Sequence, residues 1–346
     1  MTPDIAAILA VDGIAAGAIY VLVALGLVLI FTVTRVVFVP FGDIAAFTAL
    51  TLAALNEKRL PGTAGLVAAL AVIATLVELS ALARAGRWVA APRALFYLIP
   101  PLALVAAVWL ALRLDPPTWA RAGLAILLVL PIAPLLDRIV FRPIADASVL
   151  LLLIVAVALH FALAGLGLLF FGPEGVRTDP FIDGGFEIAG VEISGQSALI
   201  VASAVVFCLA LFILFEFTLT GKALRATAIN RTGARLMGIR PARAGLIAYL
   251  TGSLMAAVSG VLIAPVDTIF YDSGFLIGLK AFVGAIIGGL VSYPLTALGA
   301  VLVGLLESFA AFESSALKDV IVFAGLIPVL IWRSALTRET EDDVEE

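Results

Sequence analysis

The sequence predicts an all-α, polytopic membrane protein, and two observations support this prediction. Apolar residues make up 63% of the 346-residue chain, whereas a soluble domain holds roughly 45–50%. They also recur in blocks of about 20 residues, the length of a helix that crosses the hydrocarbon core. We expect about eleven spans, some broken or re-entrant, in one transmembrane domain over residues 1–336. The spans lie approximately at residues 13–33, 36–55, 62–83, 94–112, 122–140, 148–171, 197–217, 242–264, 274–292, 294–312 and 316–332.

The basic residues predict the orientation of the chain. Positively charged loops lie preferentially on the cytoplasmic side, and residues 218–241 form the loop richest in basic residues. Placing this segment inside puts 14 Lys and Arg residues inside and 6 outside, with Lys280 left in a span. The N-terminus is therefore predicted outside and the C-terminus inside. There the mostly acidic residues 337–346 would form a cytoplasmic tail.

This basic segment is too regular for a loose loop, and we predict one cytoplasmic docking helix there. Thr220 could cap the helix and Gly238 could end it, while Pro241 suits the first turn of the next span. Small residues, among them Ala228 and Gly233, have short or absent side chains, so that another protein could approach the helix backbone closely. The simpler alternative is a basic loop that only sets the topology.

Charged residues inside predicted spans mark a candidate translocation pathway. A charge near the bilayer centre costs about 2.5–3.5 kcal/mol. Lys280 and Glu307 therefore each need a partner or water, unless Lys280 reaches the membrane interface. Asp43 follows Gly42 at a break in the second apolar block, where irregular backbone is tolerated beside protein or a water-filled path. The alternatives are structural roles for Lys280 and Glu307 and, for Asp43, a helix N-cap.

The sequence offers no support for an enzyme, a metal site or a cofactor. It contains a single histidine, His160, and a single cysteine, Cys208, which excludes an H-E-x-x-H site and an internal disulfide. The sequence also lacks a G-x-x-x-x-G-K-[ST] phosphate loop, so ATP hydrolysis would need another chain. We expect His160 to pack in an apolar span, because no acid lies within a turn or two of it in the sequence.

The longest predicted external loop, residues 172–196, holds five acidic residues and is rich in glycine. Within it, residues 186–194 alternate apolar and polar side chains, which predicts a small β-hairpin. The loop is large enough to receive a periplasmic partner but too small to form a domain.

Four stretches of the sequence carry a family resemblance and together cover most of the chain. They are GIAAGAIYVLVALGLVLIFTVTRVVFVPFGDIAAF (13–47), DRIVFRPIADASVLLLLI (137–154), GKALRATAINRTGARLMGIRPARAGLIAYLTGSLMAAVSGVLIAP (221–265) and GLKAFVGAIIGGLVSYPLTALGAVLVGLLES (278–308). In this order they resemble a permease subunit of the branched-chain amino-acid type of bacterial ABC importer.

The resemblance implies a non-catalytic permease in the bacterial inner membrane that imports a small polar solute by ATP-driven alternating access. Branched-chain amino acids would be the leading solute, with urea, short amides or aromatic acids as alternatives. The implied partners are two ABC ATPase subunits, a second related permease or a copy of the chain, and a periplasmic solute-binding protein. Membrane lipid would surround it, and no nucleic acid is expected. The alternative function is a stand-alone secondary transporter or channel, which would need no docking helix.

The resemblance also assigns roles to single residues. The predicted ATPase-coupling site has six residues. The resemblance places four of them at the ATPase groove: Arg225, Asn230, Arg231 and Gly238. The other two, Ala228 and Gly233, come from the small-residue pattern described above.

The chain departs from the family pattern in two places. The family has Asn-Phe-Ala-His-Gly where this chain has FVPFG, so Phe41 stands at the histidine position. Phe41 therefore joins Gly42, Asp43, Lys280 and Glu307 as a candidate for the translocation pathway. Residues 84–121 resemble an inserted hairpin that contains one whole span.

Overall fold

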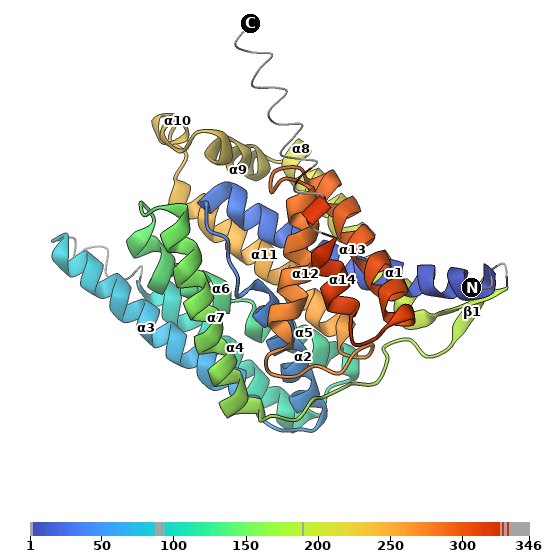
Figure 1. The fold of residues 1–346 in the computed structure, drawn as a ribbon. Coiled ribbons are helices and arrows are strands. Elements are labelled where there is room, and N and C mark those ends of the chain that lie inside the picture. The colour runs from blue at the N-terminus through green and yellow to red at the C-terminus, as the bar shows by residue number, and fades with distance from the viewer. Residues whose placement is uncertain are drawn as a thin grey trace, which may run out of the picture.

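The computed structural model describes residues 3–86, 92, 94–188, 190–325, 327, 328 and 331. It confirms a polytopic helical protein (Figure 1). In this part of the chain, eight helices or helical runs are long and apolar enough to cross a membrane, and α2 (Phe41–Asn56) and α12 (Ser273–Ile287) are shorter apolar helices. The other elements are α1 (Pro3–Thr34), α3 (Gly62–Arg84), α4 (Leu95–Leu114), α5 (Thr118–Val129), α6 (Ile132–Leu136), the π-helix η2 (Asp137–Phe141), the 3₁₀ turn η3 (Arg142–Ile144), α7 (Val149–Phe171), β1 (Gly185–Ile188), β2 (Val191–Ser194), α8 (Gly195–Phe217), α9 (Leu219–Ile229), α10 (Arg231–Leu236), α11 (Pro241–Ile263), α13 (Tyr293–Glu313) and α14 (Lys318–Ala324).

The predicted spans overlap these helices, but several bounds differ. Helix α1 begins at Pro3, before the predicted span 13–33, and the predicted span 122–140 is divided among α5, α6 and η2. The predicted span 36–55 begins with non-helical backbone before α2, and the helix of span 274–292 ends at Ile287. The span 316–332 is described only in part. The acidic tail 337–346 lies outside the described residues, as do Arg87, Arg93, Arg333 and Arg338. The number of crossings and the orientation therefore stay predictions.

Loops that were predicted on the same face meet in the structure. Lys58 Nζ and Arg121 Nη2, from two predicted outer loops, each lie 2.6 Å from a carboxylate oxygen of Asp115. The hydrogen bond from Lys58 lowers the pKa of Asp115. This exposed cluster therefore stabilises the fold while Asp115 is ionised, and its contribution is lost as the pH falls through that lowered pKa. On the predicted cytoplasmic face, Arg142 Nη2 donates to the carbonyl oxygen of Ala242 at 3.2 Å.

Helix α1 is the centre of the bundle. The most apolar stretch of α1 is 83% buried, compared with 11% for α4, and it packs against α13, α11, α12 and α8. Gly17 permits a close approach of α1 and α13, because a Cβ on Gly17 would lie 2.7 Å from the Cα of Val301 in α13. The 32 residues of α1 are about 48 Å long. The helix is thus longer than the roughly 30 Å hydrocarbon core, and its first turns project beside the β-hairpin (Figure 1).

The second predicted span is broken, as expected. After α1 the backbone turns at Arg35, whose φ is +64°, and residues 35–40 are not helical. Lipid cannot satisfy the hydrogen bonds of such backbone, so it must be covered by protein. Phe38 is fully buried here, with its ring centroid 5.4 Å from that of Tyr249 and 5.7 Å from that of Phe141.

The outer loop 172–196 contains the predicted hairpin. Strands β1 and β2 pair antiparallel, with Phe186 opposite Ile193. The loop is fixed to the segment after α11 by a β-bridge between Val176 and Ile269 and by a 2.9 Å hydrogen bond from Arg177 Nε to the carbonyl oxygen of Pro265. The hairpin and the end of α11 therefore belong to one surface.

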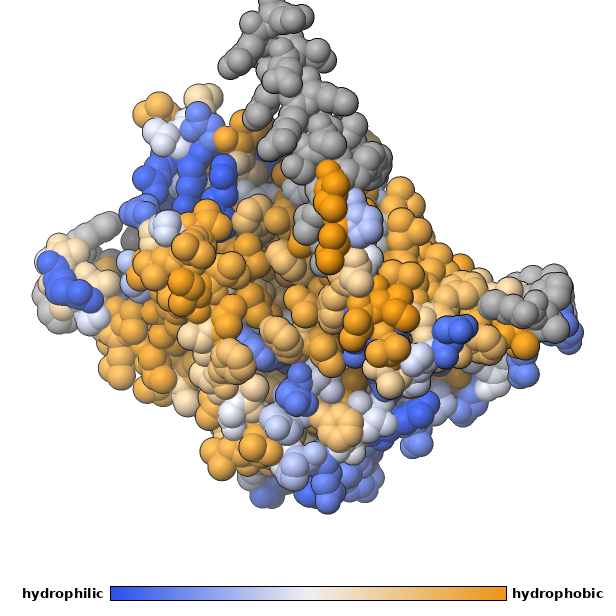
Figure 2. All heavy atoms as spheres, viewed as in Figure 1, coloured by the Kyte–Doolittle hydropathy of each residue, from blue (hydrophilic) through white to orange (hydrophobic). Residues whose placement is uncertain are grey.

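Helix α4, which lies in the predicted insertion, is at the edge of the bundle. It packs against α3 and α5, while Phe96, Trp109 and Leu110 are exposed. Apolar side chains also cover most of the middle of the face in Figure 2, and hydrophilic ones gather at its lower rim and around α9 and α10. A surface of this kind fits lipid contact. That residues 84–121 are an insertion stays a prediction.

The contact between α2 and α12 generates a stability prediction. A Cβ on Gly42 would overlap the carbonyl oxygen of Gly274, whereas a Cβ on Gly65 in α3 would meet no atom within 4 Å. Because overpacking costs typically about 1–3 kcal/mol, we expect Gly42→Ala to lower the free energy of unfolding in detergent by that amount. Gly65→Ala is the matched control and should change it little. Equal stability of the two variants would contradict this account of the contact.

Candidate functional site

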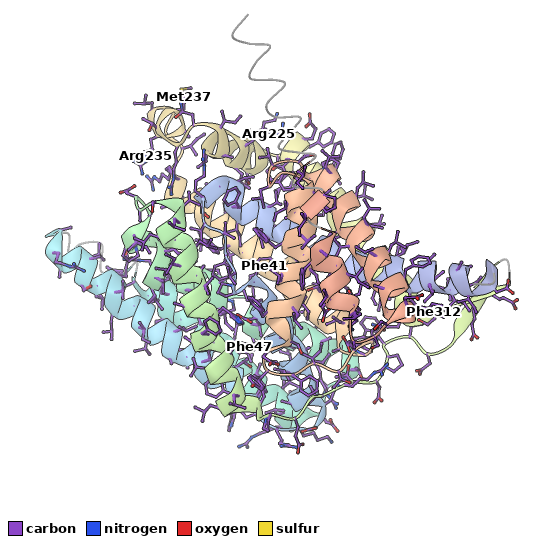
Figure 3. All side chains as sticks on the ribbon, in the orientation of Figure 1. Phe41, Phe47, Arg225, Arg235, Met237 and Phe312 are labelled. Atoms are coloured by element: carbon purple, nitrogen blue, oxygen red, sulfur yellow. The ribbon has the colours of Figure 1, made fainter. Side chains whose placement is uncertain are left out.

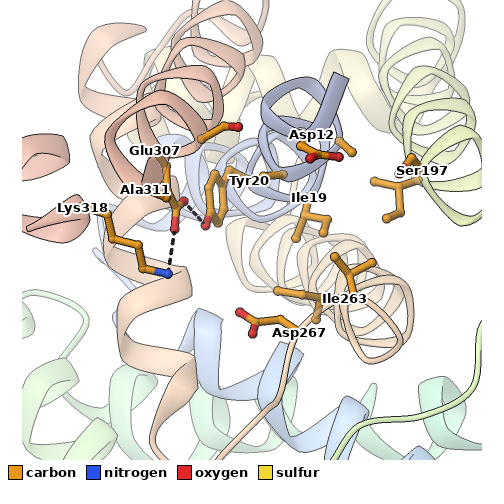
Figure 4. A pocket seen from close by; sticks show the side chains of 14 residues that line it. Asp12, Ile19, Tyr20, Ser197, Ile263, Asp267, Glu307, Ala311 and Lys318 are labelled. Carbon is orange, nitrogen blue, oxygen red and sulfur yellow. Dashed lines mark hydrogen bonds and ion pairs between the residues drawn. The ribbon is translucent and has the colours of Figure 1, made fainter. Parts of the chain in front are cut away.

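A cavity of about 410 Å³, named the outer cavity after the predicted outer side on which it lies, opens between α1, α8, α11 and α13 (Figure 4). Pockets that hold small ligands measure roughly 300–1,000 Å³, so this cavity suits a small molecule. Its walls combine apolar and ionisable side chains: Asp12, Ile19, Tyr20, Asp267, Glu307 and Lys318. It lies beside the segment after α11 to which the loop 172–196 is fixed, because Asp267 belongs to that segment.

Glu307 and Lys280, which the sequence placed in separate spans, form one buried pair. Lys280 Nζ lies 2.5 Å from Glu307 Oε1, and their side chains are only 7% and 12% exposed. Tyr20 Oη donates to Glu307 Oε2 at 2.5 Å, and Asp319 lies 2.9 Å from Lys280 Nζ. The network joins α1, α12, α13 and α14. Sequence reasoning expected a partner for each charge but did not identify it.

Asp43 is paired with His160, and the expectation that His160 packs without an acid partner was wrong. His160 Nδ1 lies 2.8 Å from Asp43 Oδ2, and both side chains are buried. The partner lies 117 positions away in the sequence, so a search within a turn or two could not find it. The alternative of Asp43 as an N-cap was also wrong, because Pro40 occupies that position of α2.

The other residues of the predicted pathway are packed inside the bundle. Phe41 is fully buried, and a Cβ on Gly26 would overlap its ring, so that Gly26 has no room for a side chain. Gly42 is buried against α12. Of the five predicted pathway residues, Glu307 lines the outer cavity and Lys280 lies directly behind it. The role of all five in transport stays a prediction.

A smaller cavity of about 200 Å³ lies beside the broken helix. Its lining is apolar and comes from α1, the non-helical stretch, α7 and α12: Leu27, Val37, Val39, Val157, Phe275 and Phe282. The ring of Phe275 also stacks on His160, with centroids 4.9 Å apart. This cavity and the Asp43–His160 pair therefore share one wall.

The segment 218–241, which we call the cytoplasmic segment after its predicted side, forms two helices rather than the one predicted. Thr218, not Thr220, caps α9, because Thr218 Oγ1 accepts a hydrogen bond from Gly221 N at 3.0 Å. Asn230 then leaves the helical conformation and caps α10, with its Oδ1 accepting from Gly233 N at 2.8 Å. An Asn side chain competes for backbone hydrogen bonds and so favours such a cap over a helix interior.

The predicted end of this segment is confirmed. Gly238 has a φ of +81°, a conformation that a side chain disfavours, and Pro241 is the first residue of α11. The connection from α10 to α11 is therefore short and defined.

The two cytoplasmic helices present exposed apolar side chains among basic ones. Leu236 and Met237 are 84% and 82% exposed, and Met237 points away from the bundle whereas Arg235 points back toward it (Figure 3). Contiguous exposed apolar surface marks an interaction site. The six predicted coupling residues divide by burial: Arg225, Asn230 and Gly238 are exposed, and Ala228, Arg231 and Gly233 are half-buried.

A group of ion pairs beneath these helices was missed by sequence reasoning. Arg142 Nε lies 2.7 Å from Asp137 Oδ2, and Arg138 Nε lies 2.6 Å from Glu78 Oε2. Asp137 and Arg142 are five residues apart. Residues at this spacing lie on one face of a π-helix such as η2, but not of an α-helix. In the sequence, Arg138 and Arg142 were counted only among the basic residues that set the topology.

The buried network around Glu307 predicts an unusual mutational pattern. Removing one partner of a buried ion pair costs about 3–5 kcal/mol, whereas removing both charges is often neutral. We expect Lys280→Met to lower the thermal unfolding temperature strongly and the double variant Lys280→Met/Glu307→Gln to recover most of the loss. A double variant that is no more stable than Lys280→Met alone would contradict this interpretation.

A comparison with known proteins places the chain in a family. The family model described as "Branched-chain amino acid transport system / permease component" matches residues 9–330. The chain is 31% identical over 203 residues to the high-affinity branched-chain amino acid transport system permease protein LivH of Escherichia coli K12 and of Salmonella typhimurium LT2. It is 32% identical over 207 residues to the permease protein BraD of Pseudomonas aeruginosa.

These matches cover 57% of this chain, 66% of each LivH protein and 67% of BraD. The chain thus spans slightly less than two thirds of the LivH length. The family model, in contrast, covers nearly the whole chain. The protein therefore belongs to the permease-component family of branched-chain amino acid transport systems, and the apolar helices of its described residues fit a multi-pass membrane protein.

Proposed function

We propose that this chain is the transmembrane permease subunit of an ATP-driven ABC importer for a small amino acid. The observation that carries the proposal is the pair of capped cytoplasmic helices, α9 and α10, with their exposed apolar surface. A transporter that works alone has no use for such a surface. A motor protein that grips it would supply the energy that this chain cannot generate.

The connection from α10 to the outer cavity supports this coupling role. Helix α10 leads into α11 through a short turn, and α11 ends at Ile263, which lines the outer cavity. The 23 residues of α11 extend over about 35 Å. A displacement of α10 would therefore move one wall of the outer cavity.

The outer cavity suits an amino acid that carries an apolar side chain. Asp12 and Asp267 offer acceptors for an ammonium group, Lys318 offers a donor for a carboxylate, and Ile19 and Ile263 provide apolar surface. We propose a branched-chain amino acid as the solute. Urea, short amides and aromatic acids are the competing solutes, and they lack either the ammonium group or the branched aliphatic chain.

Three kinds of partner follow from this proposal. Two ATPase subunits would hold the coupling segment 218–241, and a periplasmic binding protein would dock near the loop 172–196 and deliver the solute. A second related permease, or a copy of this chain, would complete the membrane part. The exposed face of α4 would then remain in contact with lipid.

One observation favours a second candidate, a secondary transporter. The pairs Asp43–His160 and Lys280–Glu307 are buried ionisable groups at membrane depth, and such groups often form ion pathways. A secondary transporter would use them to couple the solute to an ion gradient, without an ATPase.

Affinity purification of the tagged chain from its native membrane tests the proposed function. We expect ABC ATPase subunits and a periplasmic binding protein to co-purify, and the ligand of the binding protein then names the solute. Recovery of the chain without any ATPase, under conditions that keep it folded, would favour the secondary transporter.

The exposed apolar surface of α10 generates a sharper prediction. We expect Met237→Asp to reduce ATPase co-purification at least about tenfold, because a charge in an apolar contact must be desolvated. Leu60→Asp is the matched control, since Leu60 is also an exposed apolar residue but lies on the predicted outer face. Both variants should insert normally. If they retain equal amounts of ATPase, α10 is not the docking surface.

A further inference from the structure

A second polar cavity, of about 260 Å³, lies under the cytoplasmic helices. It is enclosed by the end of α1, by η2 and η3 with the residues after them, by α10 and by the start of α11. Its charged lining consists of five residues: Asp137, Arg142, Asp146, Arg231 and Arg235. It is separate from the outer cavity, with which it shares no residue.

The charges of this cavity are not all paired. Arg142 is engaged by Asp137 and by the carbonyl oxygen of Ala242. Arg231 and Arg235 make no hydrogen bond or ion pair with any residue in the described part of the chain, and Arg231 Nε is buried without an acceptor. A buried donor without an acceptor is costly, so Arg231 requires an acceptor that the described part of the chain does not provide, whereas Arg235 is exposed at the rim of the cavity.

The other side of the cavity carries an unpaired acid. Asp146 follows η3 and forms no ion pair within the described residues, although it lines the same cavity as Arg231 and Arg235. Asp137 lies close enough to Arg231 to interact electrostatically, but its Oδ2 is already bonded to Arg142. Among the described residues, the cavity therefore presents two cations of α10 and one anion beyond η3 that form no ion pair.

We propose that this cavity binds a small zwitterion, namely an α-amino acid on the cytoplasmic side. Its carboxylate would accept hydrogen bonds from Arg231 and Arg235, a pairing that the planar guanidinium favours, and its ammonium group would face Asp146. The volume is below that of pockets for drug-sized ligands, roughly 300–1,000 Å³, which suits a molecule of this size. The choice of an amino acid rests on the proposed function.

Because of the position of the cavity, a bound ligand would affect the docking helix. Residues of α10 form one side, and the segment after η3 forms another, so a bound amino acid would tie the docking helix to the membrane helices. In the proposed function, the ATPase moves α10. An amino acid that has accumulated in the cytoplasm would bind in the cavity and restrain this movement.

Binding to the purified full-length chain in lipid nanodiscs tests the proposal. Isothermal titration would compare L-leucine with L-leucinamide, which lacks the carboxylate, and with 4-methylpentanoate, which lacks the ammonium group. Each analogue loses the charge-assisted hydrogen bonds of one group, so we expect both analogues to bind at least about tenfold more weakly than leucine.

Variants locate the site. Arg235→Gln and Asp146→Asn should each weaken leucine binding about tenfold, since each removes one charged contact. Lys222→Gln, an exposed basic residue of α9 outside the cavity, should leave this binding unchanged. Asp267→Asn, in the outer cavity, instead reports any leucine that is bound there. Thermal unfolding of each variant checks that it is folded.

Several results would overturn the proposal. They are equal binding of leucine and 4-methylpentanoate, loss of binding in Asp267→Asn alone, and equal affinities in all variants. Each of these can occur while ATPase subunits still co-purify with the chain. A failure of this proposal is therefore distinguishable from a failure of the proposed function.

Discussion

The structure depends on one constraint: the hydrocarbon core offers no hydrogen-bond partner, so charged groups and irregular backbone at that depth need partners in protein or in a water-filled path. Two buried networks meet this requirement. Lys280 is held by Glu307 and Asp319, with Tyr20 donating to the same Glu307 carboxylate, and Asp43 is held by His160. The non-helical residues 35–40 are covered by protein instead of lipid. Each arrangement joins segments that are distant in the sequence, and together they fix how the short helices α2 and α12 sit against α1.

This rigid interior explains how the two ends of the molecule can be linked. Helix α11 connects the turn after Gly238 to the outer cavity at Ile263 and Asp267. At its cytoplasmic end, Arg142 bonds to the carbonyl oxygen of Ala242, so the first turn of α11 is held by η3. The joint at Asn230, which belongs to neither α9 nor α10, is the place where the cytoplasmic segment departs from regular helix. We therefore regard α10 and the start of α11 as one mechanical unit.

The sequence predicted the features that depend on local pattern. Apolar blocks predicted the spans, alternation predicted the hairpin, and the special backbone preferences of Gly238 and Pro241 marked the end of the docking segment and the start of α11. It failed where the deciding partner is distant or the geometry unusual. His160 and Asp43 are 117 positions apart, and Asp137 pairs with Arg142 through a π-helix rather than an α-helix. The break at Asn230 was missed because the basic residues on both sides continue a helical pattern across it.

The central claim is that energy for transport enters through the cytoplasmic helices from a separate ATPase. Uptake of radiolabelled leucine into proteoliposomes tests this most directly. Vesicles that contain the chain with its co-purified partners, and with the binding protein outside, should accumulate leucine only when ATP is supplied at the ATPase side. Vesicles that contain the chain alone should not accumulate it under a proton or sodium gradient. Concentrative uptake by the chain alone, driven by such a gradient, would contradict the account.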